Sequence, residues 1–214
     1  MTNICTAFND NSLPWELFQS TMDVCKDLHI SEYYLTGSML KKFHGYYPEY
    51  KSNLLLSYPI SINDPQVELH LIEKYIEAYG HKINEIVYSP TMEGFVYDDW
   101  IKIKENIKIY GDFLYRNTVK GSLFIGLGLL SNEDDLFRVA DLAEQRKIHS
   151  IILGCCEHKI EDFLIQSHEI QKSVSIPVSV FIEENANCEW EVLVNAPFAK
   201  KIVSSDYILS LMRE

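Results

Sequence analysis

The sequence lacks the features that would tie it to a membrane or to a nucleic acid. Positive charge is scarce, because 19 Lys and Arg residues face 31 Asp and Glu residues, for a formal net charge of −12. Such a surplus disfavours binding to a nucleic-acid backbone or to an anionic membrane surface. No apolar run approaches the roughly 18 residues of a membrane span, and the N-terminal stretch MTNICTAFNDNSLPW has no basic leader with an apolar core. We therefore expect a cytoplasmic protein whose partner is neither a nucleic acid nor a membrane.

Cysteine pairs with metal-binding or redox spacing are also missing. The five cysteines form no C-x-x-C pair, and their odd number predicts free thiols in a reducing compartment. The segment Cys155–His158 (CCEH) places two thiols, a carboxylate and an imidazole in succession. A structural zinc site, however, needs four convergent ligands, usually from two spaced motifs, and only Cys188 and His149 could supplement this one. We expect neither a bound metal nor a cofactor.

Short apolar runs alternate with longer segments of helical spacing along the whole chain. The predicted strands are Tyr33–Thr36, Asn53–Tyr58, Glu85–Tyr88, Ser122–Leu127, Ser150–Leu153, Pro177–Ile182, Glu191–Val194 and Ile202–Ser204. The predicted helices are Pro14–Leu28, Val67–Tyr79, Asp98–Tyr110, Asn132–Lys147, Ile160–Lys172 and Tyr207–Met212. This alternation predicts parallel strands and a single α/β domain over residues 1–214, a (β/α)8 TIM barrel. A doubly wound open sheet is the alternative, but the segment Leu35–Lys42 (LTGSMLKK) has no GxGxxG loop to support it.

Five motifs from Leu54 onward follow one another in the order of a known family. They are Leu55–Pro59 (LLSYP), Ile72–Pro90, Asp98–Trp100, Leu129–Glu133 (LLSNE, followed by Ala-Asp-Leu-Ala) and Lys201–Ser205 (KIVSS). In this order and spacing the chain resembles deoxyribose-phosphate aldolase, a short TIM-barrel enzyme that forms a Schiff base. The resemblance covers most of the chain and implies an aldolase-like barrel.

The same resemblance implies that the Schiff-base chemistry is lost. The family's nucleophile is a lysine in a K-T-S-T-G motif, and burial together with a neighbouring cation keeps part of its amine neutral. Ungapped alignment places Ile152 at the lysine position, and a shift of one residue places Leu153 there. The two other lysines of the family's site align with Ser122 and near Ile176–Pro177. With all three lysines replaced, the family's mechanism cannot run in this chain.

Some polar residues of the family's site have counterparts here. Glu85 aligns with a family aspartate; because it is a charged residue that opens an apolar strand, we expect it either at the barrel mouth or in an ion pair at the rim. Ser179 aligns with glycines that bind the substrate phosphate. Ser204 and Ser205 precede an apolar helix, whose free amides could bind an anion, although such a serine is equally an ordinary N-cap. Together these residues suggest a small phosphorylated or carbonyl ligand.

Other candidates come from the residues that follow predicted strands, which face the active-site mouth in a TIM barrel. Cys155 or Cys156 could act as a thiolate nucleophile beside His158. Adjacent residues on an extended segment point to opposite sides, however, and buried free cysteines are commonly structural. Glu183 and Glu184 could perform acid–base work at the same mouth, or they could be solvated loop residues.

Two functions stay open. The first is a non-catalytic relative of the aldolase that binds a small molecule or another protein. The second is a lyase or isomerase that works without an imine, using Glu85 and one of the two cysteines, Cys155 or Cys156. Tyrosines clustered around the first predicted strand either form a homodimer interface or pack under the following loop; they are Tyr33, Tyr34, Tyr46, Tyr47 and Tyr50.

Overall fold

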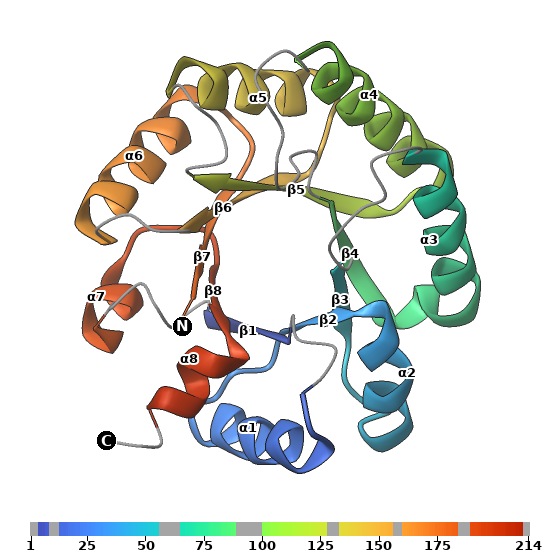
Figure 1. Cartoon of the computed structure of the whole chain (residues 1–214), viewed down its shortest axis with the longest axis vertical. Coiled ribbons are helices and arrows are strands. Elements are labelled where there is room, and N and C mark those ends of the chain that lie inside the picture. Colours follow the sequence, from blue (N-terminus) through green and yellow to red (C-terminus); the bar gives the residue numbers. More distant parts are fainter. Residues whose placement is uncertain are drawn as a thin grey trace.

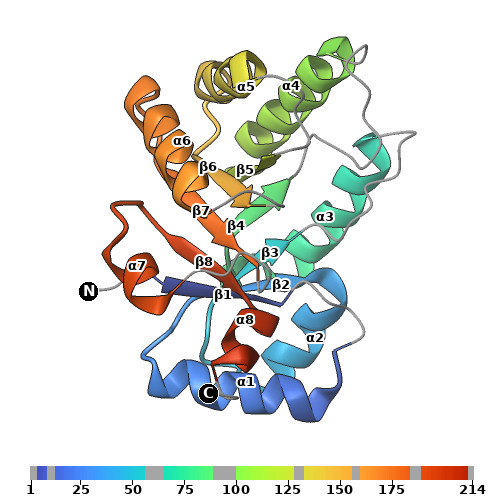
Figure 2. The same cartoon turned by 60° about the vertical axis from the view of Figure 1, so that its left-hand side comes forward.

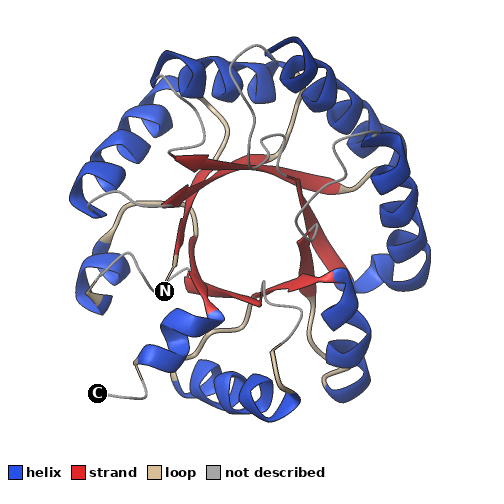
Figure 3. Ribbon diagram, viewed as in Figure 1, coloured by secondary structure: helices blue, strands red, loops and turns tan. Residues whose placement is uncertain are grey.

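Strands and helices alternate along the chain from β1 to α8 (Figures 1 and 3). The computed structural model describes residues 4–8, 13–55, 65–88, 100–127, 133–155, 160–183 and 189–211. The strands are β1 (Ile4–Phe8), β2 (Tyr33–Thr36), β3 (Ser52–Leu55), β4 (Ile83–Tyr88), β5 (Lys120–Leu127), β6 (Ser150–Cys155), β7 (Val178–Ile182) and β8 (Lys201–Ser204). The helices are α1 (Trp15–Asp27), α2 (Gly37–Tyr46), α3 (Pro65–Tyr79), α4 (Trp100–Asn117), α5 (Glu133–Gln145), α6 (Ile160–Ser173), α7 (Trp190–Asn195) and α8 (Ser205–Ser210), with a short 3₁₀ helix η1 (Gly80–Lys82) before β4.

The strands are parallel and close into a barrel in sequence order, because β8 pairs with β1. The helices form a ring around this barrel, and the turned view shows them packed along the outside of the strands (Figure 2). Successive side chains of a strand point to opposite faces, so each strand contributes to two apolar layers. The fold is therefore the (β/α)8 barrel that the alternation predicts.

The larger apolar layer lies between the strands and the helices. It is rich in fully buried aromatic side chains, among them Phe18, Phe43, Phe113 and Phe163. Each such side chain contributes roughly 2–3 kcal/mol relative to an exposed one. The second layer fills the inside of the barrel and consists of Cys5, Ala7, Tyr34, Val87, Ile152, Phe181 and Ile202, with Phe124 packed against them.

The predicted strand Glu191–Val194 is wrong, because these residues lie in helix α7. Their β-branched residues favour a strand, but Leu193 is fully buried as part of a helical turn. The sequence pattern does not indicate β1, whose ICTAF run is short and mixed, or α2, which stands where a loop is expected after the first predicted strand. The other seven predicted strands overlap β2 to β8.

The tyrosine-rich region lies mostly inside the molecule. Tyr33 and Tyr34 are fully buried, and Tyr47 and Tyr50 pack against Phe43. Tyr46, in contrast, is exposed. Packing under the following segment thus accounts for Tyr33, Tyr47 and Tyr50, whereas Tyr34 lies inside the barrel; the homodimer stays a prediction.

Candidate functional site

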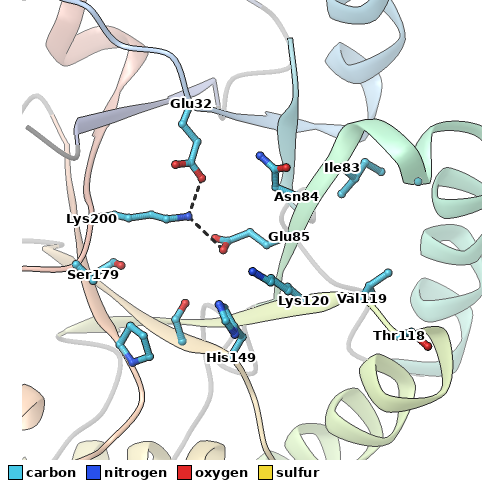
Figure 4. A pocket seen from close by; sticks show the side chains of 14 residues that line it. Glu32, Ile83, Asn84, Glu85, Thr118, Val119, Lys120, His149, Ser179 and Lys200 are labelled. Carbon is cyan, nitrogen blue, oxygen red and sulfur yellow. Dashed lines mark hydrogen bonds and ion pairs between the residues drawn. The ribbon is translucent and has the colours of Figure 1, made fainter. Parts of the chain in front are cut away.

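A pocket of about 580 Å³ opens at the end of the barrel where the strands begin (Figure 4). Its lining residues stand at or just before strand starts: Glu32 precedes β2, Lys120 and Ser150 open β5 and β6, and Lys200 precedes β8. The opposite end is the usual active-site mouth of a TIM barrel. There the structure describes the connections β2–α2 and β8–α8 in full, while the other mouth loops fall in the ranges outside the described residues.

A network of charged and polar side chains forms the inner floor of this pocket. The Lys200 ammonium lies 2.6 Å from Glu32 Oε1 and 3.3 Å from Glu85 Oε2. It also donates a hydrogen bond to the Tyr34 hydroxyl at 3.1 Å. Tyr34 in turn donates to Glu85 Oε1 at 2.8 Å, and Asn53 Nδ2 donates to Glu32 Oε1 at 2.8 Å. All three protons of the ammonium group therefore have acceptors.

The electrostatics of the network keep Lys200 charged. Burial alone would lower the pKa of Lys200, but the negative charge of Glu85 and the hydrogen bond to Glu32 outweigh burial and raise it. Burial would likewise raise the pKa of Glu32, yet the hydrogen bonds from Lys200 and Asn53 lower it. A lysine held as an ammonium ion is a poor nucleophile, because only the neutral amine attacks a carbonyl carbon.

Glu85 belongs to this network and not to the mouth. It is buried, at 5% exposure, and stands near the start of β4. Of the two positions left open by the sequence, an ion pair is the one observed, although it lies inside the barrel and not on its rim. Nothing in this geometry tests a catalytic role for the residue.

Glu85 and Cys155 lie at opposite ends of the barrel. Glu85 pairs with Lys120, the first residue of β5. Cys155 pairs with Leu127, the last residue of the same strand. At about 3.3 Å per residue the two levels are roughly 20 Å apart. Glu85 therefore lies far from Cys155, while Cys156 falls outside the described residues, so a joint role of Glu85 and a cysteine stays a prediction.

Ile152 and Leu153, the two residues that align with the family's lysine, lie in different apolar layers. Ile152 is fully buried inside the barrel, whereas Leu153 packs into the layer beneath the helices. Only Ile152 thus faces the space where a substrate would have to bind. Beside it, Phe124 and Phe181 pack edge to face with ring centroids 5.7 Å apart, so apolar side chains fill the middle of the barrel.

The remaining predicted residues do not converge on one site. Ser179 lines the pocket where the strands begin, while Ser204 and Ser205 lie at the opposite end. Ser204 is the N-cap of α8, since its hydroxyl accepts the Tyr207 N–H at 3.1 Å. Cys155 ends β6, and Cys156 lies outside the described residues. The structure therefore assigns only the N-cap among the roles weighed for these residues.

Glu183 is the carboxylate that the structure describes just past the end of β7. It is half-buried, and burial together with the negative charge of Asp206 raises its pKa. Glu184, its predicted partner, lies outside the described ranges. A carboxyl group with a raised pKa at a barrel mouth is a candidate proton-transfer group.

Sequence reasoning missed Lys200, Glu32 and Lys120, all of which face the pocket (Figure 4). Each stands two residues before an interior side chain, as Lys200 does before Ile202. Counting back in steps of two from the apolar interior positions would have indicated them. In the described part of the chain, no group of three His, Cys, Asp or Glu residues is arranged to hold a metal, and none of the helices there has the length and apolar character of a membrane span.

The closed barrel with its ring of helices defines the class of protein: an aldolase-like TIM barrel. No family model and no curated protein matches the sequence. Solved structures, in contrast, do match the fold of the chain. The aldolase QR15 has a TM-score of 0.69 at 15% identity, over 99% of this chain and 95% of that chain.

Two further structures show that the likeness extends to proteins with different activities. A protein from Coccidioides immitis described as a deoxyribose-phosphate aldolase has a TM-score of 0.71 at 8% identity, over 99% of this chain and 85% of its own. The 3-dehydroquinate dehydratase of Geobacillus kaustophilus has a TM-score of 0.63 at 13% identity, over 100% of this chain and 91% of its own. At such identities these proteins share the fold, and one fold supports many chemistries.

Proposed function

We propose that this aldolase-like barrel has lost Schiff-base chemistry and serves as a non-catalytic protein that binds a small molecule or another protein. The position of Ile152 carries the proposal. This side chain occupies the barrel interior on the strand that bears the nucleophilic lysine in the resembled family, and it packs among apolar neighbours. An imine needs an amine at that place, and an isoleucine has none.

The charged state and the position of Lys200 support the same proposal. Its ammonium group belongs to the charged network where the strands begin, and two carboxylates hold it there. Its raised pKa leaves very little neutral amine at neutral pH. It also lies near the start of β8, away from the mouth where TIM-barrel active sites occur.

Reductive trapping tests the proposal. The protein is incubated with acetaldehyde and sodium borohydride at neutral pH. The mass of the intact protein is then measured, and peptide mapping locates any modified residue. We expect no stoichiometric adduct on any single lysine, only the slow, scattered alkylation of surface amines. Lys200→Met is the matched variant, and it should give the same pattern as the wild type. A stoichiometric adduct on one residue, at Lys200 or elsewhere, would overturn the proposal.

A second function is favoured by one observation, the raised pKa of Glu183 at the mouth. A lyase or isomerase without an imine would need such a group to remove a proton next to a carbonyl. Exchange of the methyl protons of pyruvate in D₂O, followed by NMR, tests this alternative. Catalysed exchange that Glu183→Gln abolishes would support an enzyme, and exchange at the buffer rate would support the non-catalytic role.

A further inference from the structure

The pocket at the start of the strands is large enough for a small ligand and lies at the end of the barrel opposite to the mouth. Its volume of about 580 Å³ falls within the range of roughly 300–1,000 Å³ that is typical of small-molecule sites. In most TIM barrels this end contributes only stability. A pocket of this size at this end is therefore a candidate ligand site.

The polar groups on the floor of the pocket already have partners within the protein. The carboxylates of Glu32 and Glu85 accept from Lys200, and the hydroxyl of Ser150 is hydrogen-bonded to that of Ser122. These groups form a closed floor. A ligand gains little from groups whose hydrogen bonds it would first have to break.

Lys120 and His149 are not part of this floor. Both side chains are exposed and point into the pocket from neighbouring strand starts (Figure 4). The backbone fixes their spacing, because the His149 N–H donates to the Gly121 carbonyl at 2.9 Å. Neither side chain has an ion-pair or hydrogen-bond partner among the described residues. The Ser179 hydroxyl, on β7 next to β6, faces the same space (Figure 4).

The charges around the pocket limit what this wall can bind. Glu32 and Glu85 share one ammonium group, so the floor keeps one negative charge when all three groups are ionised. Lys120 adds one positive charge on the adjacent strand β5, where it pairs in register with Glu85. A ligand with a single negative charge can pair with Lys120, whereas the second charge of a phosphate dianion would face the negative floor with no other unpaired lysine of the pocket lining beside it.

We propose that this pocket binds a small monocarboxylate, held by the Lys120 ammonium group, the His149 imidazole N–H and the Ser179 hydroxyl. The carboxylate accepts one hydrogen bond from each of these groups, and the bond from Lys120 is charge-assisted. This inference rests on the proposed binding role and names a site and a ligand class for it.

Titration with glycolate, followed by ¹H–¹⁵N NMR of the full chain, tests the proposal. We expect saturable shifts that include the backbone amides of the β5 and β6 starts. Lys120→Gln should weaken binding at least about ten-fold, as expected for a lost charge-assisted hydrogen bond, and His149→Gln should weaken it less. Lys108→Gln, which removes one exposed charge on α4 outside the pocket, is the matched control and should bind as the wild type does.

Two other probes test which class of ligand the pocket binds. Glycolamide has the shape of glycolate without its charge and should not bind, and inorganic phosphate should bind more weakly than glycolate. No saturable response to millimolar glycolate, equal affinity in Lys120→Gln and wild type, or tighter binding of phosphate would each overturn the inference. The outcome is separable from the trapping test, because an imine adduct would contradict the proposed function without changing the glycolate titration.

Discussion

The Lys200 ammonium group and the Glu32 carboxylate lie 2.6 Å apart although 168 residues separate them in the sequence. Lys200 stands before β8 and Glu32 before β2, the strands on either side of β1. The ion pair therefore spans the place where the barrel closes. With Glu85 on β4 as the third member, one ammonium group connects three strand starts.

Lys200→Met should destabilise the fold by about 3 kcal/mol, because it leaves two carboxylates in the barrel without their cation. The free energy of unfolding in urea at neutral pH measures this change. Lys172→Met, at an exposed position on α6, is the control and should change the stability little. Equal stabilities of the two variants would mean that water, and not Lys200, compensates the carboxylates.

The same network should make stability depend on pH on the acid side. The pKa of Glu32 is lowered in the folded protein, so its stabilising contribution is complete above the ordinary pKa of a glutamate and is lost as the pH falls below about 4. Glu32→Gln should be less stable than the wild type at neutral pH and should approach it at acid pH. Urea unfolding across this pH range checks the prediction, and a constant difference at every pH would contradict it.

Two glycines, one inside the barrel and one on an outer helix, offer a test of packing. A Cβ atom on Gly154 would meet the ring of Phe124, which is itself packed against Phe181. Gly154→Ala should therefore cost about 1–3 kcal/mol, as overpacking does. At Gly45, near the end of α2, a Cβ would meet nothing within 4 Å. Gly45→Ala should stabilise by up to about 1 kcal/mol, since alanine favours the helix. Thermal unfolding of both variants decides the point, and a neutral Gly154→Ala would show that the Phe124 ring can move aside.

The fold class could be predicted from the sequence because the spacing of apolar residues indicates most strands and helices locally. Apolar runs such as Ile151–Leu153 and the amphipathic stripe of α5 depend on neighbours in the chain. Where local preference and tertiary packing disagreed, as in α7, the sequence misled. Its β-branched residues favour a strand, but the position of Leu193 against the core selects a helix.

The candidate site was harder to predict because its contacts are not local. Tyr34 and Glu85 are 51 residues apart, and only the strand register brings them together. The motifs of the resembled family lie at the ends of strands, where its catalytic residues stand. They therefore give no information on the residues at the strand starts. Alternation along β6 would, however, have decided between Ile152 and Leu153, since only one of two adjacent side chains can face inward.

Glu183→Gln should stabilise the protein at neutral pH, in contrast to Glu32→Gln. The pKa of Glu183 is raised in the folded state, so folding disfavours its charged form. The resulting cost appears as the pH rises through the ordinary pKa of a glutamate and is complete above the raised value. The gain of the glutamine variant should therefore be present at neutral pH and vanish below about pH 4, where the carboxyl group is protonated in both states.

Asp206→Asn provides the matched control for this prediction, because Asp206 contributes part of the shift. Removing its charge should lower the pKa of Glu183 toward its ordinary value, so that Glu183→Gln gains less in the Asp206→Asn background than in the wild type. Urea unfolding of the four proteins at neutral and at acid pH completes the cycle. A gain from Glu183→Gln that is as large at acid pH as at neutral pH would point to better packing of the amide and not to relief of a buried charge. A loss at neutral pH would instead show that the carboxylate is stabilised where it stands, and the group could then no longer be regarded as a proton donor at the mouth.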